Sequence, residues 1–276
     1  MRASNPRLEG NGSTPIPSLQ VMHDTAGERF KAHPSKCYQR HIRELYAKTE
    51  KREPIASLSG AHVEAITNEE ASTIILKYEW LRTMGSGTVA CYGLKLNGEL
   101  LGVACFSVLG GRIRRICVAG TEEETKELES ATVCLCRGAC VPWAPSNAAS
   151  FLIRWACKCA YKERGWKIFF AYSDSDAGEI GTVYQAVGWY FIGDNFRKGK
   201  YHTDYQSPDG KTIWTSYKIH HQKISRAQLL RDGWKPVRRY GKKKWVWFEG
   251  ERLERAYLKS LCRYPFLPYP KREIAA

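Results

Sequence analysis

The sequence predicts a mixed α/β fold, a β-sheet flanked by helices, with a basic C-terminal extension. Three observations predict it: apolar strand-like runs alternate with helix-like segments, a hairpin signal joins two of the strands, and most of the positive charge lies late in the chain. With 276 residues, of which 43% are hydrophobic, the chain can bury a sizeable core. No apolar run reaches the roughly 18 residues that a membrane helix needs, so we expect a soluble protein that is not inserted into a membrane.

The first predicted elements are a helix and a hairpin. Thr67–Glu70 has the capping-box pattern, and apolar residues at helical spacing follow it to about Arg82. Thr88–Leu96 and Glu99–Val108 are rich in strand-forming residues, and the Asn97-Gly98 pair between them favours a tight hairpin turn. We therefore expect two antiparallel strands directly after the helix.

Further along the chain, strands and helices alternate. In order, we expect a strand at Arg112–Val118, a helix at Glu122–Glu129, a strand at Ala131–Val141, a helix at Ala148–Arg164, a strand at Trp166–Tyr172, a helix at Thr182–Val187 and a strand at Trp189–Ile192. The turn-rich loop Pro142–Asn147 supplies Ser146 or Asn147 as the cap of the long helix. The exposed start of that helix is a natural seat for a phosphate group.

Charge and composition divide the chain into three parts. Residues 1–25 include a Pro-, Ser- and Gly-rich stretch without the apolar centre of a secretory signal, so we expect them to be disordered. Residues 26–194 form the predicted core. Residues 195–276 carry 20 Lys and Arg against 7 Asp and Glu, which accounts for +13 of the total charge of +15. This extension predicts a polyanionic partner, nucleic acid first and an acidic membrane surface second.

The ten cysteines indicate a reducing compartment rather than a disulfide framework. Seven of them lie inside apolar segments, where free thiols behave as small hydrophobic groups. No CxxC motif occurs, and Cys134 and Cys136 have the spacing of one strand face, which argues against structural zinc. We expect a cytoplasmic protein.

The order of elements resembles the GNAT acyltransferase superfamily, in which the strand before the central helix splays from its neighbour. Three stretches are more specific: Tyr78–Gly85, Tyr172–Ala186 and Arg263–Arg272 resemble the Mom-type DNA-modification proteins of bacteriophages. The resemblance covers about residues 69–272. It implies a GNAT-like, splayed mixed sheet, and an enzyme that attaches a carbamoylmethyl group to the N6 amine of adenine in phage DNA and so protects it from restriction.

The resemblance also implies an acyl-CoA or related donor, whose pyrophosphate lies at the start of the central helix. GNAT proteins have an Arg/Gln-x-x-Gly-x-Gly/Ala loop there, whereas this chain has Arg137-Gly138-Ala139 inside a strand and Pro142–Asn147 as its loop. We expect the donor to contact residues of this strand, loop and helix: Arg137, Gly138, Ser146, Asn147 and Ser150. A second departure is Glu79-Trp80, which stands where Mom-type proteins have a His-Tyr pair.

An adenine amine attacks an electrophile poorly unless its proton is removed and the developing charge is stabilised. Asp174 ends a predicted strand and Tyr184 lies on the next helix, so both are expected at one opening of the sheet, with Glu79 as a third catalytic residue. The alternatives are a turn aspartate, a packed tyrosine and a solvated helix carboxylate. The resemblance adds the possibility that Glu79, Asp174 and Tyr184 hold iron. The oxygen-ligand pattern of a calcium loop at Asp174, Asp176 and Glu179 is incomplete, which excludes a calcium site.

Cations and aromatic residues alternate in the extension, a pattern that suits phosphates and stacked bases together. The expected nucleic-acid contacts are Arg238, Arg239, Lys242, Lys243, Lys244 and Trp245. Alternatively, Trp245, Trp247 and Phe248 form a core strand with solvated lysines, and both interpretations can hold together. The expected partner is double-stranded DNA with a flipped adenine, because stacking and pairing shield the reacting atom inside a duplex.

Three functions remain open at this point. The first is the DNA adenine transferase. The second is an acyl-CoA-dependent N-acyltransferase that acts on a protein or small-molecule amine. The third is a non-catalytic DNA-binding protein on the same scaffold. The basic extension favours the first and third, and the polar residues at strand ends favour the first two.

Overall fold

The computed structural model describes residues 37–85, 87–108, 122–194, 202–210, 213–214, 219, 223–239 and 241–271. They belong to two compact units. The main unit contains the described residues up to Asp194 and those after Tyr240, and the small unit contains the described part of His202–Arg239. The expected disorder of residues 1–25 and the expected strand at 112–118 lie outside the described residues.

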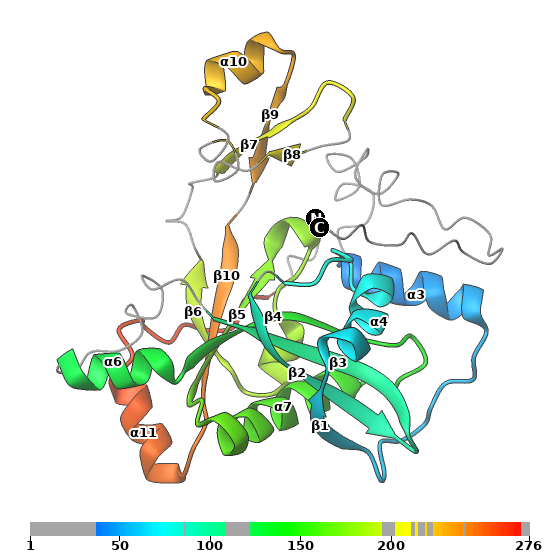
Figure 1. Cartoon of the computed structure of the whole chain (residues 1–276), viewed down its shortest axis with the longest axis vertical. Helices are drawn as coiled ribbons and strands as arrows, with labels where there is room; N and C mark the ends of the chain where they lie inside the picture. Colours follow the sequence, from blue (N-terminus) through cyan, green and yellow to red (C-terminus); the bar gives the residue numbers. More distant parts are fainter. Residues whose placement is uncertain are drawn as a thin grey trace, which may run out of the picture. The chain divides into compact units, whose positions relative to one another are not determined.

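The main unit is built on a seven-stranded sheet with the order β1-β2-β3-β4-β5-β10-β6 (Figure 1). The strands are β1 (His62–Ile66), β2 (Thr88–Leu96), β3 (Glu99–Ser107), β4 (Thr132–Cys140), β5 (Ile168–Asp174), β10 (Lys242–Phe248) and β6 (Tyr190–Asp194). All neighbouring strands are antiparallel except β4 and β5, which are parallel. The predicted mixed α/β sheet is confirmed.

The two parallel strands separate toward their carboxyl ends. Their paired residues run from Thr132 opposite Ile168 to Leu135 opposite Ala171. Beyond this point β4 continues to Cys140 and β5 to Asp174 without further pairing to each other. The sheet therefore splays between β4 and β5, as predicted, and opens a gap in which side chains from both strands and from the following loops can meet.

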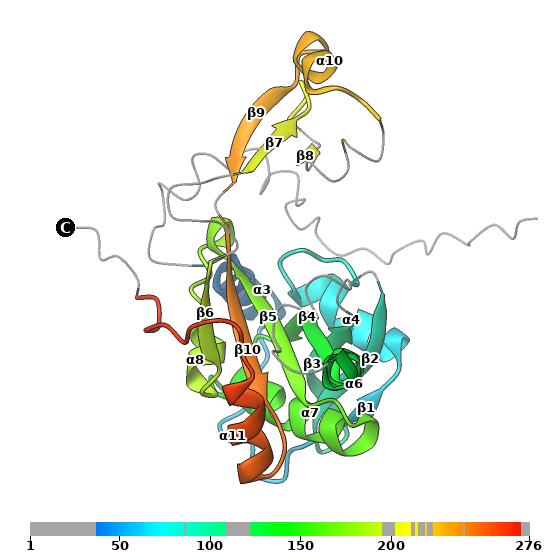
Figure 2. The ribbon, with the colours of Figure 1, turned by 90° about the vertical axis from the view of Figure 1, so that its left-hand side faces the viewer.

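Helices cover the sheet and connect its strands. They are α3 (Tyr38–Glu50), α4 (Asn68–Tyr78), α6 (Glu122–Ser130), α7 (Ala148–Arg164), the 3₁₀ helix η1 (Ser175–Ala177), α8 (Thr182–Ala186) and α11 (Arg252–Ser260). Helices α4 and α7 both pack against the β2–β4 part of the sheet, and α11 lies beside β10 (Figure 2). No helix in these ranges is both long and apolar enough to cross a membrane.

Local signals produce several of these elements. The capping box at α4 is present, with the Thr67 hydroxyl accepting from the Glu70 N–H and the Glu70 carboxylate accepting from the Thr67 N–H. The β2–β3 turn has positive φ angles at Asn97 (50°) and Gly98 (81°), which a tight hairpin of this kind requires. Helix α7 has the predicted bounds, and Gly165 ends it in the left-handed conformation.

The predicted extension at residues 195–276 is divided in the structure. Strand β10 returns to the main sheet and lies between β5 and β6. The small unit has its own sheet, β8-β7-β9, formed by β7 (His202–Gln206), β8 (Ile213–Trp214) and β9 (Lys235–Arg239), together with helix α10 (Arg226–Arg231). Its core contains Tyr205, Ile219 and Leu229. The small unit is therefore an insertion between two neighbouring strands of the main sheet.

Candidate active site

The end of β5 carries two acidic residues that are joined through the backbone. The Asp174 N–H donates to Glu179 Oε2 at 3.0 Å, and the Glu179 N–H donates to the Asp174 carbonyl oxygen at 3.0 Å. These two bonds close the loop that contains η1 and place the Glu179 carboxylate at the splayed end of the sheet. Glu179 was considered from the sequence only as part of an incomplete calcium loop, and it was missed as a site residue.

Glu179 has a strongly perturbed acidity. Burial, together with the negative charges of Asp174 and Glu79, raises the pKa of its carboxyl to about 7, although the N–H of Asp174 and the charge of Lys242 oppose the shift. A carboxylate with a pKa near neutrality can accept and release a proton at physiological pH. Glu179 is therefore a candidate acid–base residue, and the charges of Asp174 and Glu79 both act on its carboxyl group.

Glu79 lies directly after α4, because the helix ends at Tyr78 instead of the expected Arg82. It has extended backbone angles, and its Oε2 accepts from the N–H groups of Leu81 and Arg82 at 2.9 and 3.1 Å. The residue is only 5% exposed. Burial raises the pKa of Glu79 to about 7, although the Arg137 charge and the two N–H groups oppose the shift. The solvated-helix alternative for Glu79 is wrong.

Tyr184 lies on α8 and packs into an aromatic group. Its ring centroid is 5.2 Å from that of Trp189 and 5.6 Å from that of Trp245. Burial, followed by the charge of Glu179, raises the pKa of the Tyr184 phenol well above its usual value. Tyr184 is thus a packed residue, as its alternative interpretation held, and it also lies within electrostatic reach of Glu179.

Gly181 is the residue that lets Trp245 approach this corner. It precedes α8 with a φ of 72°, and a Cβ atom added there would lie 2.2 Å from Cζ2 of Trp245. Trp245 in turn donates its indole N–H to the Ser173 hydroxyl at 3.0 Å. Only glycine fits both the backbone conformation and the contact. This packing holds the loop that carries Glu179 and Tyr184.

The structure thus gathers Glu79, Asp174 and Glu179, which we call the acid cluster, with Tyr184 beside Glu179. Three elements supply it: the end of α4, the end of β5 and the loop before α8. Lys242, the first residue of β10, pairs with Asp174 in the sheet and adds a positive charge at the same end. Two of the three expected catalytic residues, Glu79 and Asp174, therefore act through their charges on Glu179, a residue that was not expected in the site.

The iron expectation finds no matching donor set. Within the described ranges no three His, Cys, Asp or Glu side chains come together as a site for a metal ion. Oε2 of Glu79 already accepts from two backbone N–H groups, and Oε2 of Glu179 accepts from one. We therefore derive no step of the chemistry through a metal.

The start of α7 offers the expected donor side. Asn147 caps the helix without a side-chain hydrogen bond to it, Ser150 donates its hydroxyl to the Asn147 carbonyl at 2.9 Å, and Ser146 is exposed. Arg43 of α3 fixes the preceding loop by donating to the carbonyl oxygens of Pro142 and Ala144. The result is a braced loop followed by an open helix N-terminus, a geometry that suits a phosphate group.

Arg137 lies on β4 nearer to the acid cluster than expected. Its Nε donates to the Thr83 carbonyl oxygen at 2.8 Å, and its charge lowers the pKa of Glu79. Arg137 thus ties the splayed strand β4 to the loop after α4. Gly138 follows on β4, exposed and opposite Ala104 of β3.

A model of the Mom protein family matches residues 60–271. The chain belongs to the Mom protein family.

Three solved structures illustrate the similarities found beyond the family. An IAA acetyltransferase from Bacillus cereus is 12% identical, covers 68% of this chain and 99% of its own, and has a TM-score of 0.36. A Bacillus subtilis acetyltransferase in complex with CoA is 11% identical over 69% and 99%, with a TM-score of 0.37. A spermidine N-acetyltransferase from Vibrio cholerae is 9% identical over 72% and 99%, with a TM-score of 0.39. No curated protein matches the chain.

In this Mom family chain the six expected nucleic-acid contacts are divided between the two units. Arg238 and Arg239 lie on β9 of the small unit, where the Arg238 side chain is exposed. Lys242, Lys243 and Lys244 begin β10 of the main unit. Trp245 is fully buried between β5 and β6, so its ring is not available to stack on a base, and the core-strand alternative is correct for it.

Proposed function

We propose that this Mom family protein is a transferase that modifies the N6 amine of adenine in DNA. Family membership and the acid cluster support the proposal. The carrying observation is that two carboxyl groups, those of the buried Glu79 and the half-buried Glu179, have pKa values raised to about 7 at the splayed end of a mixed sheet. The transferred group is the carbamoylmethyl-type group that the family resemblance implies.

The step that these residues serve is attack by the adenine nitrogen on an electrophilic carbon of the donor. A nitrogen–carbon bond forms while the bond from that carbon to the leaving group breaks, and the leaving group keeps the electron pair. The proton lost by the N6 amine passes to the Glu179 carboxylate. Because the pKa of Glu179 is about 7, a substantial fraction is ionised at neutral pH and still basic enough to accept the proton.

The other residues have supporting roles in the proposal. Tyr184 remains protonated at neutral pH because its pKa is raised, so its phenol can donate a hydrogen bond to charge that develops in the transition state. Glu79 adds a second proton acceptor and keeps the pKa of Glu179 high through its charge. Asp174 orients Glu179 through its backbone N–H.

The donor in this proposal is acyl-CoA or a related phosphate-bearing molecule. For a carbamoylmethyl product its leaving group must be bonded to the methylene carbon that the nitrogen attacks, because attack on a thioester carbonyl would give an N-acyl adenine. Its phosphates would lie at the start of α7, where Asn147 leaves the helix without a side-chain cap and Ser146 is exposed. Unpaired N–H groups and the helix dipole at such a terminus favour negative charge. In this proposal the reacting end of the donor would lie between β4 and β5, where the two strands are no longer paired.

The test compares Glu179→Gln with the unchanged protein in cells whose DNA is digested to nucleosides and analysed by mass spectrometry. We expect an altered deoxyadenosine with the unchanged protein and a loss of about 100- to 10,000-fold in its formation with Glu179→Gln, since a positioned general base contributes this much. Glu53→Gln is the matched control, because Glu53 is an exposed glutamate outside the site.

Two results would contradict the proposal. If a protein or a small-molecule amine carries the new group while adenine is unchanged, the N-acyltransferase is correct. If the protein binds DNA firmly but no molecule is modified, and Asp174→Ala changes nothing in the cell, the non-catalytic DNA-binding protein is correct.

A further inference from the structure

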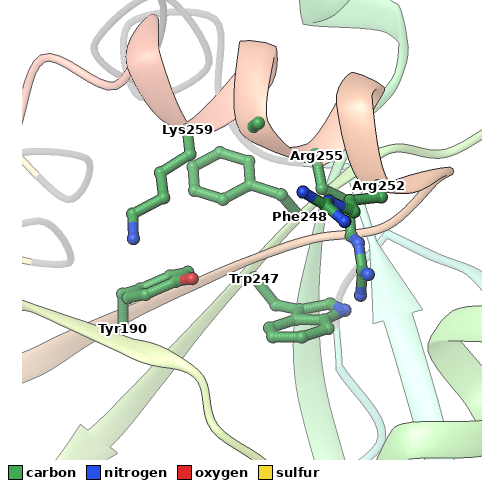
Figure 3. Close-up of a pocket in the computed structure, with 7 residues that line it drawn as sticks. Tyr190, Trp247, Phe248, Arg252, Arg255 and Lys259 are labelled. Atoms are coloured by element: carbon green, nitrogen blue, oxygen red, sulfur yellow. The ribbon is translucent and has the colours of Figure 1, made fainter.

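A second pocket lies at the other end of β10 from the acid cluster. It has a volume of about 330 Å³ and is lined by Tyr190, Trp247, Phe248, Arg252, Arg255, Ala256 and Lys259 (Figure 3). Lys242 at one end of β10 pairs with Asp174, and Phe248 at the other end pairs with Ile168. Since a strand rises about 3.4 Å per residue, the two ends are roughly 20 Å apart. The pocket is therefore separate from the candidate active site.

Three cations of α11 border the pocket. Arg252, Arg255 and Lys259 are spaced by three and four residues, so they lie on one face of the helix. None of the three forms a salt bridge with a carboxylate of the described chain. Glu254 of the same helix instead contacts Lys167 at 3.0 Å and the Tyr161 hydroxyl at 3.0 Å. Lys259 already lies over the rings of Tyr190 and Phe266, so the charge that is left for an anionic ligand is that of Arg252 and Arg255.

Aromatic rings form the side of the pocket opposite the helix. The ring planes of Tyr190 and Trp247 differ by 18°, and their centroids are 6.5 Å apart. The cationic side chains of α11 lie across from these rings (Figure 3). The Trp247 indole N–H donates to Glu249 Oε2 at 3.0 Å, which fixes the orientation of that ring. Lys259 Nζ lies 4.4 Å from the centroid of Tyr190. Nearly parallel rings of this kind offer a stacking surface for a planar base.

We infer that this pocket binds one nucleotide of a DNA strand, with its base against Trp247 and Tyr190 and its phosphate at Arg252 and Arg255. The ligand class follows from the combination of two arginines without a salt bridge in the described chain, aromatic rings and a volume that suits a single nucleotide. The assignment to a DNA strand rests on the proposed function and deepens it. A DNA strand that runs parallel to β10 would cover the roughly 20 Å between the two sites. At about 3.4 Å per nucleotide, the bound nucleotide then lies about six positions from the flipped adenine.

The experiment measures binding of the full chain to fluorescently labelled oligonucleotides at several salt concentrations. Arg252→Gln with Arg255→Gln is the test variant, and both side chains border an open pocket, so the fold does not depend on their charge. Arg40→Gln with Arg154→Gln is the control, because it removes the same charge from exposed positions on α3 and α7. We expect the test variant to bind at least tenfold more weakly. The salt slope, which is the slope of the logarithm of the binding constant against the logarithm of the salt concentration, should fall by about two in magnitude, and the control should change little.

A second variant tests stacking. Trp247→Leu should weaken binding of an oligonucleotide about tenfold, and the loss should vanish when the oligonucleotide carries an abasic site about six positions from its target adenine. Equal weakening with and without the base would contradict the stacking role. In the modification assay, Arg252→Gln with Arg255→Gln should raise KM for the oligonucleotide and leave kcat unchanged.

A free nucleotide is the other source of the same chemistry, and deoxyadenosine monophosphate distinguishes it. If this nucleotide binds at the pocket as tightly as the oligonucleotide, and Arg252→Gln with Arg255→Gln weakens only the nucleotide, the strand assignment is wrong. If the variant binds oligonucleotides like the unchanged protein while adenine is still modified, the pocket inference fails and the proposed function stands. If the variant loses binding but no adenine is ever modified, the proposed function fails and the pocket stands.

Discussion

The two ends of β10 show how differently one strand can use positive charge. At its start, Lys243 pairs with Asp194 at 3.3 Å, Lys244 lies 4.2 Å from the ring centroid of Tyr264, and the charge of Lys242 acts on Glu179. Beyond its other end, Arg252 and Arg255 of α11 border a pocket and form no salt bridge with the described chain. The lysines thus serve the main unit itself, whereas the arginines remain available to a ligand.

The comparison teaches that the density of cations in a sequence does not identify the ones that bind a partner. The three lysines are the longest run of positive charge in the chain, yet two of them already have partners in the fold. The cations of α11 are spread along a helix among glutamates, and only the structure separates them by face. Charge availability depends on neighbours that lie far away in the sequence.

The largest expected effect concerns the packing at the acid-cluster end. Gly181→Ala should lower the free energy of unfolding by about 3 kcal/mol or more, because its Cβ would overlap Trp245 and its φ is positive. Gly188→Ala is the control, since Gly188 has a φ of 78° but no atom within 4 Å of an added Cβ. Gly188→Ala should lower the free energy of unfolding only by the cost of the backbone strain, about 1–2 kcal/mol. Thermal denaturation of both variants checks the difference, and equal losses would contradict the role of the Trp245 contact.

The next effect concerns pH. The pKa of Glu79 is raised from 4.5 to about 7, so the native state binds more protons than the unfolded state between these values. Its contribution to stability is therefore complete below about pH 4.5 and is lost as the pH rises through 7. Glu79→Gln removes this loss, which amounts to about 3 kcal/mol at most.

Melting temperatures between pH 5 and pH 8 test this prediction. The melting temperature of Glu79→Gln, relative to that of the unchanged protein, should rise as the pH rises. Glu53→Gln, at an exposed position, should follow the unchanged protein throughout. A difference for Glu79→Gln that stays constant with pH would show that its carboxyl titrates at an ordinary value.

The smallest effect compares the cations of the two ends directly. Replacing Lys242, Lys243 and Lys244 together with alanine should weaken DNA binding and lower the salt slope by about one, because Lys243 and Lys244 already have partners. Arg252→Gln with Arg255→Gln should lower the salt slope by about two, although this variant removes two charges and the lysine variant removes three. Binding titrations at four salt concentrations measure both slopes. A larger change for the lysines would reverse the comparison.

The parts of the fold that were predictable are those with local signals. The α4 capping box, the Asn97-Gly98 turn and the bounds of α7 all depend on residues within a few positions of one another. The place of β10 between β5 and β6 depends on pairing with residues about 50 to 80 positions earlier, and nothing local encodes it. The buried state of Trp245 was one of two alternatives from the sequence, and only that pairing decides between them.

The candidate site divides in the same way. Asp174 was found because a polar residue at a strand end is visible in the sequence, and Glu79 because of a family resemblance. Glu179 was missed because its role depends on a backbone bond to Asp174 and on burial, neither of which leaves a pattern in the sequence. A search for acidic residues within five positions of a strand end would have included it.

The late position of β10 in the chain also determines when the molecule can become complete during synthesis. Strands β5 and β6 leave the ribosome first, and each lacks its neighbour until the residues of the small unit and then β10 have been translated. Until then Gly181 and Tyr184 have no Trp245 beside them, and the second pocket has neither Trp247 nor α11. A nascent chain that stalls before residue 242 would carry neither site and would expose two unpaired strand edges, which are targets for chaperones and proteases.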